Sequence, residues 1–299
     1  MDVVTGAFSF TGRYVAARLL ELGREVRTLT RHPQSASPFG ARVEAFPLDF
    51  DLDTLTERLR GADTLYNTYW IRSPRGSLTF DRVLNNTATL LSAAREAGVP
   101  RVVQLSVSNA STSSTLPYFR AKALAEEALS SSGLSYAIVR PTLVFAREDV
   151  LVNNIAWLLR RLPLFVVPGS GRYTLQPVAV EDVAELAVAA GLGTEPTVMD
   201  AAGPDVLSFD EFVRLVREAV GSRAAIVHGS PRLALGLSGL MGKILRDTLV
   251  TRAELAGLTR GLLTSEGPPT GSRRFAAWLQ ENAESVGRSY TSETLRNWS

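Results

Sequence analysis

The sequence predicts an α/β protein with a doubly wound parallel sheet and a smaller, mainly helical C-terminal lobe on the substrate side. Over the first two thirds of the 299 residues, short apolar runs alternate with amphipathic stretches. A turn containing glycine follows the first apolar run directly, and after Ser208 the pattern becomes mainly helical. Strand–helix alternation indicates a parallel sheet covered on both faces, because each crossover lays a helix against the sheet.

The N-terminal part is expected to contain six strands with helices between most of them. Their order along the chain predicts a switch point between the first and fourth strands, and ligands bind at such points, at the carboxyl ends of the strands. The expected strands are Val3–Val4, Val26–Leu29, Val43–Phe46, Asp63–Tyr66, Val102–Leu105 and Tyr136–Val139. The expected helices are Tyr14–Leu22, which Gly23 ends, Phe80–Ala97 and Phe119–Leu129.

The segment Thr5–Gly12 joins the first strand to the first helix and has the position of a phosphate-binding turn. Gly6 permits a tight turn and Gly12 permits close packing of the helix on the strand, so that backbone N–H groups of Phe8, Ser9 and Phe10 point toward a pyrophosphate. This predicts a Rossmann-type dinucleotide site. Ser9 stands where a further glycine is usual; its side chain either crowds the pyrophosphate or bonds to it. The alternative is a tight turn that binds nothing.

After Pro141 the alternation loosens. Val150–Leu162 is expected to be a helix, Val178–Gly191 a short strand and then a helix, Val198–Asp200 a last strand, and Ala225–Val227 an isolated short strand. The expected organisation is an NAD(P)-binding Rossmann domain over residues 1–149, a mixed segment over 150–205 that returns to the sheet, and a helical lobe over 206–299. The apolar segment Pro231–Leu245 is interpreted as a buried helix, with a lid or partner surface and a membrane-surface helix as alternatives.

Composition excludes several kinds of protein. The chain has 45% hydrophobic and 21% charged residues, which is ordinary for a globular protein, and a net charge of +2 without a basic block, which argues against nucleic acid as a partner. It contains no cysteine and only two histidines, His32 and His228, far apart in sequence. We therefore expect no disulfide, no zinc–thiolate site and no histidine-rich metal site; these counts do not exclude a carboxylate site, but no metal ligand is assigned.

The sequence also suggests a compartment. The first strand begins at Asp2 with no signal-peptide pattern before it, and no apolar run reaches the length of a transmembrane helix. We therefore expect a cytoplasmic protein without a transmembrane segment, with peripheral membrane contact as a weaker alternative.

The end of the second strand indicates which dinucleotide binds. An acidic residue at that point would hold the ribose 2′-hydroxyl of NAD, but the strand runs into Arg31 instead. A guanidinium suits a 2′-phosphate, so NADP(H) is the preferred cofactor and NAD(H) the alternative. Asp49 and Phe50 follow the third strand and are placed to meet the adenine amino group and ring. The alternative for Arg31 is a solvated surface residue.

Tyr118 and Lys122 form the candidate catalytic pair. They lie four residues apart in a predicted helix and so share one face. A phenol needs a nearby cation to exchange protons at neutral pH, and a lysine supplies that charge and can hold the nicotinamide ribose. Ser108, just past the fifth strand, is expected to orient a substrate carbonyl, and Ser106 to lie near the cofactor. An ordinary exposed helix pair is the alternative.

Together these motifs resemble the extended and atypical short-chain dehydrogenase/reductases. The turn from Gly6 to Gly12, the pair Tyr118 and Lys122, and Arg140-Pro141-Thr142 carry the resemblance. Finer detail at 117–122, 147–149 and 176–183 resembles the group related to the NAD(P)H-binding accessory subunit of respiratory complex I, whose bacterial members are described as NAD-dependent epimerase/dehydratases. The resemblance implies that Thr68, Tyr69, Pro141, Thr142 and Val144 line the nicotinamide side.

Two functions follow from these observations. The first is an NADPH-dependent oxidoreductase, or an epimerase or dehydratase, that acts on a small molecule bearing a carbonyl or hydroxyl group. In this reading Tyr118 is the acid/base, Lys122 its electrostatic and ribose-binding partner, and Ser108 the carbonyl-orienting residue. The second is a non-catalytic NADPH-binding protein with a structural, assembly or sensor role. A complete tyrosine–lysine pair favours the enzyme, whereas the resemblance to a structural subunit favours the binding protein.

Overall fold

The computed structural model describes residues 1–245, 247 and 251–292. These residues form two compact units, which differ in their limits from the ranges expected from the sequence. The first contains Met1–Pro141 and Val180–Ala201, and the second contains Thr142–Ala179 and the described residues from Ala202 onward. Among the described residues, the chain therefore leaves the first unit after Pro141 and returns to it for the 22 residues Val180–Ala201.

The first unit is built on a seven-stranded sheet with the order β11-β6-β5-β4-β1-β2-β3, in which every neighbouring pair is parallel. This confirms the doubly wound fold, with its switch point between β1 and β4. The strands are β1 Asp2–Thr5, β2 Val26–Thr30, β3 Val43–Pro47, β4 Thr64–Asn67, β5 Arg101–Leu105, β6 Ser135–Pro141 and β11 Thr197–Ala201.

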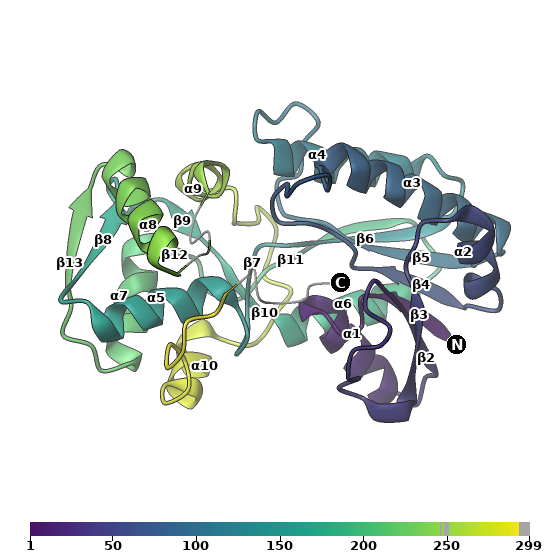
Figure 1. Ribbon diagram of the computed structural model, residues 1–299, viewed down its shortest axis with the longest axis horizontal. Coiled ribbons are helices and arrows are strands. Elements are labelled where there is room, and N and C mark those ends of the chain that lie inside the picture. Colours follow the sequence, from purple (N-terminus) through teal and green to yellow (C-terminus); the bar gives the residue numbers. More distant parts are fainter. Residues whose placement is uncertain (246, 248–250, 293–299) are drawn as a thin grey trace. The chain divides into compact units, whose positions relative to one another are not determined.

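Helices cover both faces of this sheet (Figure 1). Helices α2, α3 and α4 lie on one face and pack on each other in sequence, while α1 and α6 pack together on the other. Their bounds are α1 Phe10–Glu21, α2 Leu52–Leu59, α3 Phe80–Glu96, α4 Pro117–Ser130 and α6 Val180–Gly191, with a 3-10 turn at Gly40–Arg42. The central strands β1, β4 and β5 are buried along their whole length, which explains their apolar runs, whereas the edge strands β3 and β11 are only partly buried.

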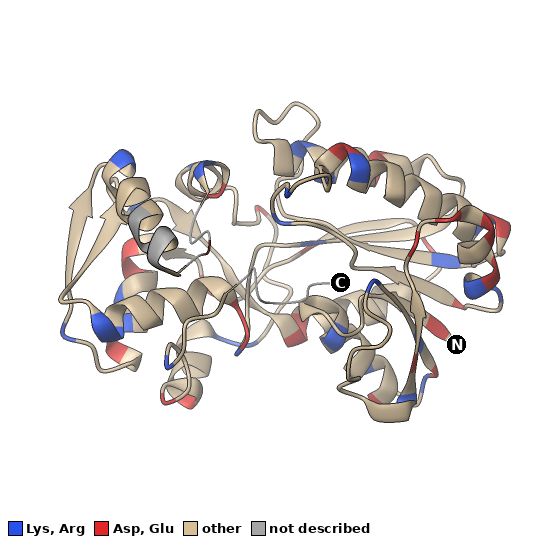
Figure 2. Ribbon diagram, viewed as in Figure 1, with Lys and Arg blue, Asp and Glu red and all other residues tan. Residues whose placement is uncertain are grey.

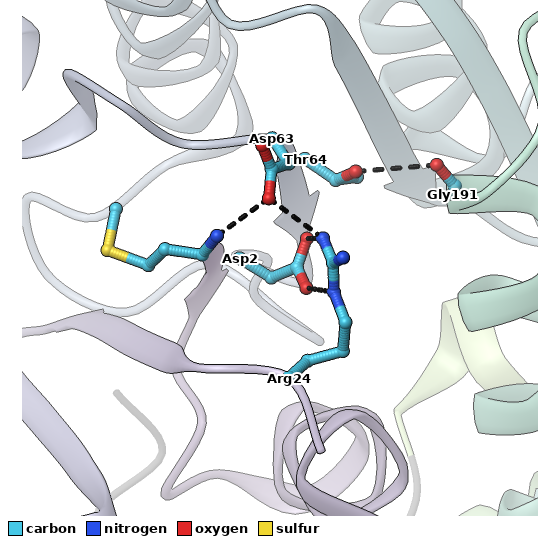
Figure 3. A network of polar contacts seen from close by, with 6 residues as sticks. Asp2, Arg24, Asp63, Thr64 and Gly191 are labelled. Atoms are coloured by element: carbon cyan, nitrogen blue, oxygen red, sulfur yellow. Dashed lines mark hydrogen bonds and ion pairs between the residues drawn. The ribbon is translucent and has the colours of Figure 1, made fainter. Parts of the chain in front are cut away.

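An ion-pair network holds the amino ends of β1 and β4 (Figure 3). Arg24 Nε lies 2.7 Å from the Asp2 carboxylate, and Arg24 Nη2 lies 2.9 Å from Asp63 Oδ2. Thr64, the next residue, donates to the carbonyl of Gly191 at the end of α6 over 3.3 Å. Asp2 is almost fully buried, and its partner Arg24 supplies the charge that a buried carboxylate requires. The network stabilises the amino ends of the strands, opposite to the carboxyl ends, where the sequence predicts the ligand site.

The second unit contains three two-stranded sheets and five helices among its described residues. The sheets pair β10 with β7, β12 with β9 and β13 with β8. Their strands are β7 Leu143–Phe145, β8 Leu164–Pro168, β9 Thr174–Leu175, β10 Pro177–Ala179, β12 Leu207–Ser208 and β13 Ala225–Gly229. The helices are α5 Val150–Arg161, α7 Phe209–Ala219, α8 Pro231–Leu245, α9 Arg252–Thr259 and α10 Phe275–Asn282.

The core of the second unit is aromatic. Phe212 and Phe275 stack with their ring centres 4.6 Å apart and their planes 8° apart, and Phe145 packs edge-on against Phe275 at 5.1 Å. The α8 helix expected at Pro231–Leu245 is present, but Leu233 and Leu237 on it are 51% and 41% exposed. These two side chains do not fit the interpretation of a fully buried helix. The side chains of Leu240, Met241, Lys243 and Ile244 lie outside the described residues.

Candidate functional site

The turn between β1 and α1 is a tight loop at the carboxyl edge of the sheet. Gly6 has a φ of +69°, a conformation that glycine adopts at little cost, and its carbonyl accepts a bond from the Ser9 backbone N–H over 2.8 Å. Gly12 lies so close to this loop that a Cβ atom on it would stand 2.2 Å from the Gly6 carbonyl oxygen. Both glycines are therefore required by the geometry, as the sequence predicts.

The N-terminus of α1 fits a bound phosphate. Ser9 occupies the N-cap position but makes no capping bond; its hydroxyl donates instead to the Gly6 carbonyl over 2.6 Å. The first turn contains no acidic residue, so no carboxylate of this turn would repel an anion at the helix N-terminus. Ser9 has an ordinary φ of −90° and hence does not need to be glycine. Its hydroxyl bonds within the turn, and whether it crowds or bonds a pyrophosphate stays a prediction. Phe8 and Phe10, beside it, are half-buried.

The next predicted contacts lie after β2 and β3. Arg31 directly follows β2 and is exposed, and Asp49 is 41% exposed in its side chain and bonds Arg58 Nη1 over 2.9 Å. Phe50 has a φ of +59°, unusual for a residue with a side chain, and its ring lies 4.7 Å from that of Tyr69. Backbone strain of this kind often marks functional sites. Phe50 and Tyr69, predicted separately, therefore form one aromatic pair.

Asn86 fixes the far side of this pair. Its side-chain amide donates to the Tyr69 hydroxyl over 2.9 Å, and it is half-buried, whereas Asn85 is exposed. Asn86, a residue of helix α3, is therefore a direct neighbour of the aromatic pair. Burial raises the pKa of the Tyr69 hydroxyl, and the Asn86 bond and the positive charge of Arg31 oppose that rise.

A buried polar network crosses the switch point of the sheet. The Thr5 hydroxyl accepts the backbone N–H groups of Thr68 and Tyr69 over 2.8 and 3.0 Å, and donates to Asn67 Oδ1 over 3.1 Å. Asn67 Nδ2 then donates to Gln104 Oε1 over 2.8 Å. Thr5, Asn67 and Gln104 are fully buried. The network ties the ends of β1, β4 and β5 together beneath the predicted cofactor site.

Lys122 is the next group along this edge. Its Nζ donates to the Leu105 carbonyl at the end of β5 over 2.7 Å, and the side chain is only 4% exposed. The same Nζ lies 4.2 Å from the centre of the Trp70 ring. Burial lowers the pKa of the Lys122 ammonium to about 7, and the charge of Glu126 opposes this. Lys122 is therefore a fixed, buried amine that gains and loses a proton near neutral pH.

Tyr118 lies one turn before Lys122 on α4, whose first residue is Pro117. It is half-buried, and its ring packs edge-on against Trp70 at 6.4 Å and against Phe80 at 6.2 Å. Tyr118 and Lys122 thus contact the same Trp70 ring. Trp70 could not be predicted from the sequence, because this residue lies in an irregular segment after β4 and has no spacing relation to α4.

The two serines differ in their surroundings. Ser106 donates to Glu126, and Glu126 forms an ion pair with Arg140, whose Nε lies 2.9 Å from Glu126 Oε1. The Ser106 hydroxyl is therefore hydrogen-bonded to a side chain of α4, and its position near the cofactor stays a prediction. Ser108 is fully buried, and its backbone N–H donates to the Pro141 carbonyl over 2.9 Å.

The remaining predicted contacts lie where the chain leaves the first unit. Pro141 ends β6, whereas Thr142 and Val144 belong to the second unit. The Thr142 hydroxyl bonds the Gln176 carbonyl, and Val144 lies in β7 opposite Val178 of β10. Their role beside a nicotinamide stays a prediction.

The described residues contain neither a helix suited to crossing a membrane nor a cluster of metal-ligating side chains. No helix among them combines the length and apolar character needed to cross a membrane. They also contain no cluster of three or more metal-ligating side chains. Basic and acidic residues are interspersed over both units (Figure 2).

Comparisons with known proteins relate the chain to enzymes and to a respiratory-chain subunit. It is 27% identical over 230 residues to the mitochondrial NADH dehydrogenase (ubiquinone) 1 alpha subcomplex subunit 9 of Arabidopsis thaliana, an alignment that covers 73% of this chain and 57% of that protein. The chain thus spans little more than half the length of this relative. It is 29% identical over 228 residues to a (4-alkanoyl-5-oxo-2,5-dihydrofuran-3-yl)methyl phosphate reductase of Streptomyces griseus, with 74% of each chain covered.

A solved structure and a family match complete the comparison. The triphenylmethane reductase of Citrobacter sp. has the same fold, with a TM-score of 0.78 at 20% identity over 95% of this chain and 99% of that one. A sequence model described as NAD(P)H-binding matches residues 6–156, which include the glycine turn from Gly6 onward, β2 to β6 and α4. The geometry of the turn and the family match agree. The chain belongs to the NAD(P)H-binding family.

Proposed function

We propose that this protein is an NADPH-dependent oxidoreductase that reduces a carbonyl group on a small molecule, with transient oxidation in an epimerase or dehydratase as a variant of the same chemistry. The observation that carries the proposal is the Tyr118–Lys122 pair. Lys122 is buried and held in place by Leu105 and Trp70, and Tyr118 precedes it by one helical turn with its ring half-exposed. A buried amine is costly, so its retention beside a tyrosine points to use in proton transfer.

The cofactor would be held by the glycine turn and the residues at the ends of the strands. The N-terminus of α1, whose first turn has no acidic residue, suits the pyrophosphate, Arg31 the 2′-phosphate, and Asp49 with Phe50 the adenine. Thr68, Tyr69, Ser106, Pro141, Thr142 and Val144 are proposed for the nicotinamide side, and Lys122 for its ribose. When bound, NADPH supplies a hydride to the carbonyl carbon.

The protein's own groups would supply the proton. In the reductive direction the Tyr118 hydroxyl donates its proton to the substrate oxygen as the carbon is reduced, and the product is an alcohol. A protonated Lys122 stabilises the phenolate that Tyr118 becomes. Ser108 donates a hydrogen bond to the same oxygen and orients the carbonyl. Since the pKa of Lys122 lies at about 7, part of the protein carries this charge at neutral pH.

The Tyr118→Phe variant tests the catalytic part of the proposal. We expect it to keep its fold and its NADPH affinity, while turnover on a panel of aldehydes, ketones and quinones falls by about a hundredfold or more, the usual effect of losing an acid/base group. Lys122→Met should lose affinity for NADPH as well as turnover. Tyr136→Phe, a half-buried tyrosine of β6, is the matched control. A panel on which the parent protein oxidises no NADPH would overturn the enzymatic proposal.

The Arg31→Ala variant tests the cofactor part. The parent should bind NADPH more tightly than NADH in a fluorescence titration, and the variant should bind NADPH about 10- to 100-fold less tightly, because it loses charge-assisted bonds to the 2′-phosphate. NADH affinity should stay the same. Arg60→Ala, an exposed arginine at the end of α2, should change neither. Equal affinities of the parent for both cofactors would contradict this assignment.

A second candidate function is a non-catalytic NADPH-binding subunit or sensor. It is favoured by the 27% identity to the NADH dehydrogenase subunit 9 of Arabidopsis thaliana. In that case Tyr118→Phe would leave every measurable property unchanged, whereas Arg31→Ala would still weaken NADPH binding. Tyr118→Phe therefore separates the two candidates, whereas Arg31→Ala tests the cofactor site that they share.

A further inference from the structure

We propose that Trp70 is a third component of the site, a positioning residue whose ring face holds the Lys122 ammonium in its charged form beside Tyr118. The inference deepens the proposed function, in which Lys122 supports proton transfer by Tyr118. Trp70 lies in the segment after β4, Lys122 and Tyr118 lie on α4, and the ring of Trp70 contacts both of these side chains.

The first argument concerns the surroundings of the lysine. An ammonium group has three donors, and taking it out of water is costly unless other groups replace the lost hydration. For Lys122 the described contacts supply one carbonyl, that of Leu105 at 2.7 Å, and the face of Trp70 at 4.2 Å from Nζ. An indole gives the strongest cation–π attraction of the aromatic side chains, and this attraction grows when water is absent. The ring thus favours the charged form.

The second argument concerns the residue type. The Nε1 atom of Trp70 is buried and has no hydrogen-bond partner among the described residues. An unsatisfied buried N–H destabilises the fold, and a phenylalanine or leucine would fill the same space without it. An indole at this position, despite the destabilising effect of its unpaired N–H, is explained if its electron-rich face is needed to stabilise the Lys122 ammonium. Phe80 stacks on Trp70 with ring centres 6.4 Å apart and planes 26° apart, and so restricts the orientation of that face.

The ionisable groups around Lys122 are few. On its own helix they are Tyr118, one turn earlier, and Glu126, one turn later. From the sheet, Arg140 of β6 reaches this region, but it is bound to Glu126 by two hydrogen bonds and offsets part of its negative charge. Glu126 therefore cannot be treated as a free counter-ion to Lys122. This leaves Trp70 and the Leu105 carbonyl as the groups dedicated to the ammonium.

The chain offers an unusually direct test, because it contains only two lysines, Lys122 and Lys243. Protein labelled with ¹³C at the lysine ε carbon gives two NMR signals, and the Lys122→Met variant identifies the one from Lys122. Titration of that signal measures the pKa of Lys122 in the full chain without cofactor, substrate or turnover. A failure of the enzymatic proposal would therefore leave this measurement intact.

Two substitutions at Trp70 give the answer. In Trp70→Leu, which keeps an apolar side chain but removes the ring, we expect the pKa of Lys122 to fall by about 0.5 to 1.5 units, and in Trp70→Phe by a smaller amount. Trp157→Phe is the matched control: Arg161 lies over Trp157 at 4.7 Å, in the second unit, and the Lys122 signal should titrate as in the parent. An unchanged or raised pKa in Trp70→Phe, or in a folded Trp70→Leu, would overturn the inference, since the ring would then only exclude water.

Discussion

Gly12 is the residue at which the cofactor turn leaves the least room. A methyl group there would approach the Gly6 carbonyl oxygen to 2.2 Å, and this neighbour is backbone that cannot swing away. Any larger residue must push α1 off the turn, which would also displace the helix N-terminus from the proposed pyrophosphate.

We therefore expect Gly12→Ala to lower the free energy of unfolding by about 1–3 kcal/mol, the usual cost of overpacking, and to weaken NADPH binding. Urea denaturation and a fluorescence titration measure the two effects. Gly236→Ala is the control, because Gly236 lies in helix α8 with nothing within 4 Å of its added methyl, and alanine is the better helix former. If Gly12→Ala is as stable as the parent, the backbone of the turn can shift enough to accommodate the methyl group.

Individual site residues differ in how far the sequence predicts them. Tyr118 and Lys122 were predictable because helical spacing alone puts them on one face. Trp70, Asn86 and Glu126 were not, since each acts on a residue from another element. Their contacts depend on how strands and helices pack, and no local spacing encodes that.

The helix α4 is the element on which the site depends most. Tyr118, Lys122 and Glu126 recur at every fourth position and so follow one face of it, and Glu126 bonds Ser106 after β5 and Arg140 of β6. This buried carboxylate fixes the helix to the sheet at two strands. The position of the tyrosine–lysine pair thus depends on an ion pair one turn away.

We expect Glu126→Gln to lower the free energy of unfolding by about 2 kcal/mol. The amide oxygen can still accept from Ser106 and Arg140 Nε, but the NH2 group that replaces Oε2 cannot accept from Arg140 Nη2, and the negative charge opposite Arg140 is lost. Partial exposure of Arg140 moderates this loss. Chemical denaturation measures it. Glu127→Gln, the exposed neighbour on the same helix, should have almost no effect. If both variants lose the same stability, Glu126 does not anchor the helix.

Among the elements, the strands of the large sheet were predicted best, because each is a buried apolar run bounded by turn residues. Helix α2 was missed: it has only eight residues, and two of them are threonines, which disfavour helices. Asp51 compensates by capping it through a bond to the Thr54 backbone N–H. Strand β8 was also missed, since its partner β13 lies some 60 residues later in the sequence.

At the scale of the whole molecule, the chain forms two units, each built from separated stretches of sequence. Residues 142–179 and the later segment share one core, in which Phe145 and Phe275 meet from opposite ends of the unit's sequence. The sequence could not predict this division, because contacts between distant segments determine the boundary. No stretch rich in glycine, proline or polar residues marks the boundary after Pro141 in the sequence.

We expect Phe212→Ala to destabilise the second unit by about 3–5 kcal/mol, as for other buried aromatic residues. In hydrogen exchange, α5 and α10 should lose protection together, although 113 residues separate them, while β5 and α4 keep theirs. Leu90→Ala in α3 is the reciprocal control, with loss confined to the first unit. Loss of protection throughout the chain in both variants would show a single cooperative unit.

The strand order has a consequence for how the protein is made. Strand β6 is complete at Pro141, but β11, which covers its free side in the sheet, is complete only at Ala201, 60 residues later. At about 5–20 residues per second, a ribosome needs roughly 3–12 s to make that stretch. During this time the emerging polypeptide presents β6 as an unpaired edge, open to pairing with other chains. The nascent protein is thus most vulnerable to aggregation before the last strand arrives, and a chaperone that shields β6 would act in that interval.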